Sequence, residues 1–239
     1  MSRIVLTGDS HLGALKHAQD LKQDSRIAGL EFQPLGNGFV SLLDFFTANS
    51  VEKSVKVTHS KWNNLIFSEK ELNKDEDFQL LAVSLPINSS RILRDVSWQR
   101  HVPWKFKKRR REIPISDGLI ETIIEQDCSK SIAFIKAIAL TGIKVVAIEG
   151  PRFFEHAPYL KRKRIEVCAD IEQRYRSYAS QKLADVGIGV IEQPTQTITK
   201  IGTTHHDYRH PDPRDEHHGN ALYGHLVCNA IVDYADCLK

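Results

Sequence analysis

The stretch RIVLTGDSHLGAL, residues 3–15, is the strongest indication of the fold. Its first half is an apolar run that stops at a Gly-Asp-Ser turn, and its second half has the spacing of a helix. The turn places Ser10 where a first strand hands over to a first helix. In α/β proteins, ligands bind beyond this end of the strands. The stretch therefore predicts an α/β fold and raises the question of what Ser10 does.

The composition is that of an ordinary globular protein. Of the 239 residues, 41% are hydrophobic and 26% are charged, which allows one sizeable core. There is no internal repeat or low-complexity tract, and one domain spanning residues 1–239 is expected in preference to two small ones. No apolar run approaches the ~20 residues of a membrane span, so no membrane partner is expected.

The four cysteines are scattered, without a C-x-x-C pair or the spacing of metal ligands. This usage is typical of reduced thiols in the cytosol. The Gly-Asp-Ser turn begins at Gly8, which leaves no room for a signal peptide ahead of it. We therefore expect a cytoplasmic protein.

Five short apolar segments, each ending in a turn signal, are expected to be strands: residues 3–8, 30–36, 78–86, 143–151 and 186–194. Helical patterns lie between or after them, over residues 10–25, 117–142, 162–187 and 219–239. Strands that alternate with helices predict a parallel sheet covered on both faces. We expect a three-layer α/β/α sandwich with a five-stranded sheet in the flavodoxin-like order 2-1-3-4-5.

Two stretches, about 52–76 and 94–118, fit this alternation poorly and are interpreted as insertions over one end of the sheet. The second holds Trp98 and Trp104, which either line a substrate cleft or pack the insertion onto the body. It also holds the basic run WKFKKRRREI, residues 104–113, interpreted as a solvated surface or, alternatively, as a nuclear signal or phosphate-binding patch. With a formal net charge of only +3, no nucleic-acid partner is expected.

The segment PDPRDEHHGNALYGHL, residues 211–226, offers the groups that a serine nucleophile needs. A serine hydroxyl must lose its proton to a base, and that base needs a group to fix its tautomer. Asp215 and His218 are three residues apart, so one short turn can hold both. Backbone N–H groups of Ser10 and Gly36 and the side chain of Asn88 follow three neighbouring strands and are candidate donors of an oxyanion hole.

This pattern resembles the SGNH (GDSL-type) hydrolase superfamily across nearly the whole chain. The family has a nucleophile in a Gly-Asp-Ser block, a glycine block, an asparagine block and an Asp-x-x-His block, and here Ser10, Gly36, Asn88 and the Asp215–His218 pair follow in that order. The phrase HHGNALYG, residues 217–224, is also similar to SGNH proteins of bacterial polysaccharide modification.

The resemblance implies that Ser10 attacks an ester carbonyl, that His218 is base and then acid, and that Asp215 orients it. It implies no cofactor and no metal. The expected substrate is a small-molecule or carbohydrate ester with a small, acetyl-like acyl group. The third block departs from the family pattern, because Asn88 lacks a glycine two residues before it and Ser89 stands in place of an aspartate. Either Gly36 or Gly38 fits the glycine block.

Other interpretations of the same residues stay open. Ser10 can be a helix cap, His217 can be the base in place of His218, and the histidine-rich tail can bind a divalent metal. His11 either lines the pocket or is simply packed.

The same triad also suits an acyltransferase, in which a sugar hydroxyl replaces water. A third hypothesis is a non-catalytic module that binds acidic polymer through basic residues of the second insertion: Lys105, Lys107, Lys108, Arg109, Arg110 and Arg111.

Overall fold

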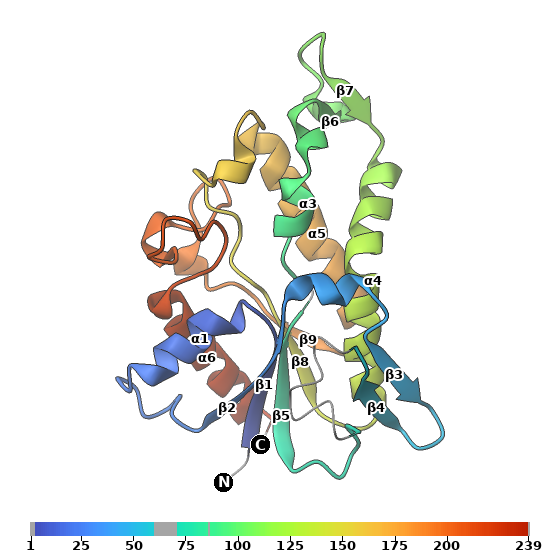
Figure 1. The fold of residues 1–239 in the computed structure, drawn as a ribbon, viewed down its shortest axis with the longest axis vertical. Coiled ribbons are helices and arrows are strands. Elements are labelled where there is room, and N and C mark those ends of the chain that lie inside the picture. Colours follow the sequence, from blue (N-terminus) through green and yellow to red (C-terminus); the bar gives the residue numbers. More distant parts are fainter. Residues whose placement is uncertain (1–2, 60–70, 86, 239) are drawn as a thin grey trace.

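A computed structural model describes residues 3–59, 71–85 and 87–238. A five-stranded parallel sheet in the order β2-β1-β5-β8-β9 runs through it (Figure 1). The strands are β1 (Arg3–Asp9), β2 (Leu30–Gly36), β5 (Phe78–Ser84), β8 (Val145–Ile148) and β9 (Gly189–Ile191). Counted along the chain, this is the predicted order 2-1-3-4-5, and the predicted fold class is confirmed.

The sheet is covered by two helices on each face. On one face, α1 (Leu12–Asp20) packs against α6 (Ala221–Asp236), and on the other α4 (Asp117–Leu140) packs against α5 (Ile165–Ala184). Alternate residues of β5 serve the two faces, because Leu80 lies in the core under α1 and α6, whereas Leu81 lies in the core under α4 and α5. Burial on both faces explains why these strands are near-continuous apolar runs.

Among the described residues, none of the helices combines the length and the apolar composition that a membrane span requires.

The first expected insertion, 52–76, is partly a hairpin. Strand β3 (Phe46–Asn49) pairs antiparallel with β4 (Ser54–Val57), so the ordered ribbon begins before residue 52. The hairpin lies against α4 (Figure 1), where Val55 and Val57 join the core. Residues 60–70 of this insertion lie outside the described part of the chain.

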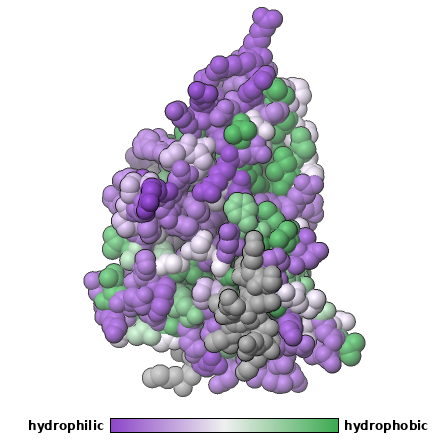
Figure 2. Space-filling view, viewed as in Figure 1, coloured by the Kyte–Doolittle hydropathy of each residue, from purple (hydrophilic) through white to green (hydrophobic). Residues whose placement is uncertain are grey.

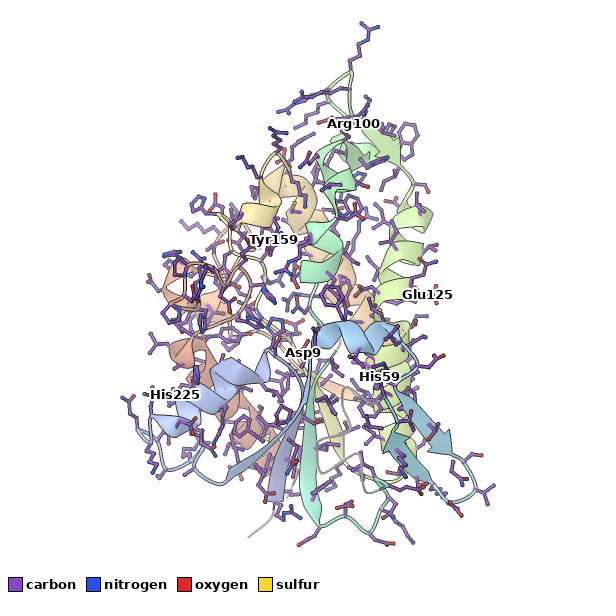
Figure 3. All side chains as sticks on the ribbon, in the orientation of Figure 1. Asp9, His59, Arg100, Glu125, Tyr159 and His225 are labelled. Atoms are coloured by element: carbon purple, nitrogen blue, oxygen red, sulfur yellow. The ribbon has the colours of Figure 1, made fainter. Side chains whose placement is uncertain are left out.

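The second expected insertion, 94–118, rises away from the sheet to the tip of the molecule, where Figure 3 labels Arg100. It follows α3 (Ser90–Arg94) and consists of short elements: η3 (Val96–Gln99), β6 (His101–Pro103), η4 (Trp104–Phe106) and β7 (Ile113–Ile115), ending at the start of α4. β6 and β7 form a two-stranded parallel pair. Other short helical turns among the described residues are η1 (Gly38–Leu42), η5 (Pro158–Leu160), η6 (Thr195–Thr197) and η7 (His206–Tyr208).

Part of the basic run is tied down by its own neighbours. Glu112 accepts hydrogen bonds from the backbone N–H groups of Arg109 and Lys108, both at 2.9 Å, and these bonds hold the pKa of its carboxyl at about 2. Lys107 donates to the carbonyl of Arg109, and Lys105 pairs with Asp170. Hydrogen bonds within the run and an ion pair to Asp170 therefore hold part of it in place, and the run is also a charged surface.

Candidate active site

The turn after β1 is fixed by close packing. Gly8 has φ +142°, and a Cβ there would lie 2.5 Å from the carbonyl oxygen of Ser84, so only glycine fits. The carboxylate of Asp9, labelled in Figure 3, accepts a hydrogen bond from the backbone N–H of His11 at 3.0 Å. Ser10 follows at the carboxyl end of the sheet with its side chain exposed. The residue that caps α1 is His11, which makes no side-chain capping bond, so Ser10 does not serve as the cap.

Ser10, His218 and Asp215 form a continuous hydrogen-bonded chain. The hydroxyl Oγ of Ser10 lies 2.8 Å from Nε2 of His218, and Nδ1 of His218 lies 2.8 Å from Oδ2 of Asp215. His218 and Ser10 are 208 positions apart in the sequence. The fold brings them together because α6, which follows His218, packs beside α1, which follows Ser10. This is the arrangement in which an imidazole can take the proton of a serine hydroxyl.

The carboxylate of Asp215 is held ionised. Burial acts to raise its pKa, but backbone hydrogen bonds from His218 (3.0 Å) and His217 (3.2 Å), together with the bond to the His218 ring, outweigh it and lower the pKa to about 2. Arg209 supports the same segment by donating to the carbonyl of Asp215 at 3.0 Å. Asp215 can therefore accept a hydrogen bond from the Nδ1–H of His218 throughout the neutral pH range.

His217, the rival base, faces another group. Its Nδ1 lies 3.1 Å from the guanidinium of Arg94. Burial, with the nearby charges of His218 and Arg94, lowers the pKa of His217 to about 4, so the ring is neutral at pH 7. The hydrogen bond to Ser10 is made by His218.

His11 is packed beneath the catalytic candidates. It is buried, and its ring centre lies 4.7 Å from that of His218. Burial holds the pKa of His11 well below its ordinary value. The Nε2 atom of His11 contacts the side-chain NH₂ group of Asn88. The Oδ1 atom of the same Asn88 amide accepts a hydrogen bond from the backbone N–H of Ser90 at 2.9 Å. The interaction uses one of the two protons of the Asn88 amide and leaves the other for a ligand.

Ring nitrogens of His11, His217 and His218 lie within 4.8 Å of one another, a spacing that a divalent cation can bridge. Within the described residues this is the one cluster with that geometry. The cluster consists of His218, which bonds Ser10, and the two rings next to it, His11 and His217. The histidines of the tail that precede His217 are not part of the cluster.

A small pocket of about 60 Å³ lies beside Ser10. Asn88 and Gly38 line it, whereas Gly36, which ends β2 opposite Asp9, is not among its lining residues. A Cβ on Gly38 would lie 2.9 Å from the carboxylate of Asp9, so the close approach of this loop to the β1 turn requires glycine. Of the two glycines that fit the sequence pattern, Gly38 is the one beside Ser10.

The two tryptophans differ in placement. Trp98 is 5% exposed, donates its indole N–H to the carbonyl of Ile92 at 2.9 Å and lines a larger cavity next to the small pocket. Trp104 is 64% exposed and lines neither the pocket of Ser10 nor the larger cavity.

Sequence reasoning missed two arginines of α3. Arg91 and Arg94 line the pocket of Ser10 and give it positive charge. Their spacing of three residues, directly after the Asn88 turn, places both on one face of a short helix, and this was the available signal. Arg91 is held between Asp127 (2.8 Å) and the carbonyl of Gly38 (2.6 Å).

The unusual Ser89 also has a structural reason. Its hydroxyl donates to the buried carboxylate of Glu172, which pairs with Arg176 at 2.6 Å. Arg176 in turn pairs with Glu149 at 2.7 Å. An aspartate at position 89 would face Glu172, and two buried carboxylates repel each other. Serine supplies a donor instead.

The fold, but not the sequence, matches known proteins. No protein-family model and no curated protein matches this chain. A Bacteroides fragilis protein classed as an acylhydrolase aligns over 100% of this chain and 88% of its own, with a TM-score of 0.52 and 11% identity. A GDSL-like lipase from Bacteroides thetaiotaomicron aligns over 98% of this chain and 87% of its own, with a TM-score of 0.54 and 11% identity. At such identity the likeness is one of fold.

Proposed function

From the SGNH hydrolase fold that this chain has, and from the geometry around Ser10, we propose that the protein is a serine ester hydrolase. The single observation that carries the proposal is the hydrogen-bonded chain from Ser10 through His218 to Asp215, with 2.8 Å at each link. A helix cap or a packed histidine does not require such a chain.

The first half of the reaction forms an acyl-enzyme. Oγ of Ser10 attacks the ester carbonyl while Nε2 of His218 takes its proton, and Asp215 stabilises the imidazolium that results. When the tetrahedral intermediate collapses, the same proton passes from His218 to the oxygen of the leaving alcohol. Water then attacks the acyl-enzyme while His218 takes a proton from it. When the second tetrahedral intermediate collapses, that proton passes to Oγ of Ser10 and the carboxylic acid leaves.

The oxyanion is stabilised by donors at the ends of three neighbouring strands. We assign this role to the backbone N–H groups of Ser10 and Gly38 and to the second amide proton of Asn88, because all three residues line the same small pocket. Gly38 replaces Gly36 in this assignment. Each donor of this kind is typically worth ~10²–10³ in rate.

The substrate of the proposal is an acyl ester of a carbohydrate alcohol, and acetyl is the simplest acyl group that fits the pocket of Ser10 itself. A pocket of about 60 Å³ beside Ser10 admits an acyl group of a few atoms. The segment that brings His218 to Ser10, residues 205–218, is rich in histidine and aspartate, and such side chains suit the hydroxyl groups of a sugar on the leaving-group side.

The test is hydrolysis of p-nitrophenyl acetate and of an acetylated sugar by the parent, Ser10→Ala and His218→Ala. Both variants should lose ~10³ or more in kcat, whereas Ser25→Ala, an exposed serine outside the site, should match the parent. Equal rates in all four proteins would refute ester hydrolysis. Adding a sugar alcohol as acceptor and analysing the products separates hydrolysis from acyl transfer.

A further inference from the structure

A second hollow lies next to the pocket of Ser10. It has a volume of about 540 Å³ and is enclosed by η1, by α3 and the insertion that follows it, and by the first half of α4. Figure 2 shows hydrophobic residues running from η1 up along the N-terminal half of α4. The apolar side chains that line the second hollow are Phe39, Leu42, Ile92, Trp98, Ile115, Leu119 and Ile123.

The charged residues of this cavity are already paired. The guanidinium of Arg91 is bound by Asp127, which also accepts the hydroxyl proton of Tyr175 at 2.7 Å. Asp95 accepts the backbone N–H of Ser97 at 2.7 Å. A sugar needs several directed hydrogen bonds. Besides these bonded groups the lining offers only Ser97, His101 and Gln126 as polar side chains, against seven apolar ones, so the cavity suits an apolar occupant.

The cavity adjoins the small pocket, because Phe39 and Arg91 line both. Phe39 is 56% exposed, so much of this large apolar side chain is accessible to a ligand. A group attached to the reacting carbon of an ester at Ser10 can therefore extend past Phe39 into the larger volume.

The position of the cavity indicates which part of an ester it can hold, the acyl group or the leaving alcohol. The leaving oxygen must face Nε2 of His218, because that atom protonates it. None of the residues that line the larger cavity comes from the segment 205–220 that holds His218. The cavity therefore lies on the side of the acyl group, away from the leaving alcohol.

We propose that this cavity is an acyl-chain site and that the enzyme prefers straight, medium-length acyl esters to acetyl esters. The inference rests on the proposed function and extends it from the small acyl group that the pocket of Ser10 admits. A cavity of roughly 150 Å³ holds benzene, so the volume found here, about 540 Å³, accommodates a chain of about eight carbons.

The expected signature is a chain-length series. Burial of one methylene is worth a factor of roughly two to four in kcat/KM. For p-nitrophenyl esters, kcat/KM should rise from acetate through butyrate and hexanoate to octanoate, by roughly 10²–10³-fold in total, and then level off when the cavity is full.

Ile123→Trp fills the cavity from the face of α4 that lines it, and Leu119→Trp does so from one turn earlier. Either variant should lower the octanoate-to-acetate ratio of kcat/KM by ~10-fold or more. The matched control is Leu140→Trp on the same helix, because this side chain is 78% exposed and about 25 Å further along α4. The control should keep the parent's ratio.

Binding of free octanoate, measured by calorimetry, separates the two proposals. Octanoate should bind the parent and Leu140→Trp and should bind Ile123→Trp at least ~10-fold more weakly. If no ester is hydrolysed but octanoate binds in this pattern, the ester-hydrolase proposal fails and the apolar site stands. If acetate is hydrolysed but the rate does not rise with chain length and octanoate does not bind, the acyl-chain site is refuted and the hydrolase stands.

Discussion

The two adjoining hollows are built in different ways. Polar residues that directly follow strands surround the small pocket, with Ser10 after β1, Gly38 after β2 and Asn88 after β5. Side chains of short elements in the insertion and of α4 surround the larger cavity. The sheet order alone brings the first set together, whereas the second depends on how one chain-specific segment packs. In the proposed enzyme, the sheet edge provides the chemistry and the insertion selects the acyl group.

The largest effect is expected at the sheet edge, from Asp215→Asn. Asparagine keeps the shape but cannot hold His218 in the required tautomer, so kcat should fall by ~10⁴ with little change in KM. Asp212→Asn, in the same segment but paired with Arg214, should leave kcat within about twofold of the parent. Steady-state kinetics on p-nitrophenyl acetate provides the measurement. A similar loss in both variants would show that the segment as a whole, and not the carboxylate of Asp215, matters.

Asn88→Ala should have a smaller effect, a loss of ~10²–10³ in kcat. Its reason is the removal of one oxyanion donor, so KM should change little. Asn49→Ala, at the end of β3 and outside the site, is the control. A loss that appears in KM instead of kcat would mean that Asn88 binds substrate without stabilising the transition state.

The smallest predicted effect concerns the lining of the small pocket, where His217 contacts Arg94. The pKa of His217 is lowered to about 4 in the folded protein, mainly by burial, whereas the unfolded chain has an ordinary value near 6.5. As pH falls below 6.5 the unfolded state therefore takes up a proton that the folded state does not. The stability that this group contributes is present above pH 6.5 and is lost toward pH 4.

Urea unfolding at pH 7 and pH 5 measures this effect. His217→Asn should reduce the drop in the free energy of unfolding between these pH values by roughly 2 kcal/mol. His17→Asn, on the exposed face of α1, should leave the drop unchanged. An equal drop in the parent and His217→Asn would show that His217 titrates alike in the folded and unfolded states.

The sequence was sufficient to predict what strand ends determine. Val5 and Leu6, buried in a central parallel strand, produce an apolar run that is visible without a structure, and β2 has the predicted bounds, 30–36. The glycine that stops α4, Gly142 at φ +98°, was likewise visible in the pattern. The proximity of Ser10 to the Asp215–His218 turn followed from the motif and its place in the fold.

The remainder depends on packing that no local pattern records. The β3–β4 hairpin begins at Phe46 because its apolar side packs on α4, a contact with residues far along the chain. The pairing of His217 with Arg94 spans 123 positions, and the choice of Gly38 over Gly36 depends on its contact with Asp9. Trp98 and Trp104 look equivalent in the sequence, yet Trp98 is buried in the wall of the larger cavity and Trp104 is exposed and does not line that cavity.

Covalent labelling of the nucleophile tests the central claim most directly. The parent, Ser10→Ala and His218→Ala would each be treated with diisopropyl fluorophosphate, and the modified peptide identified by mass spectrometry. The account predicts one adduct on Ser10 in the parent and much slower labelling in His218→Ala, because the hydroxyl then lacks its base. An adduct on another residue, or labelling of Ser10 at the same rate without His218, would contradict it.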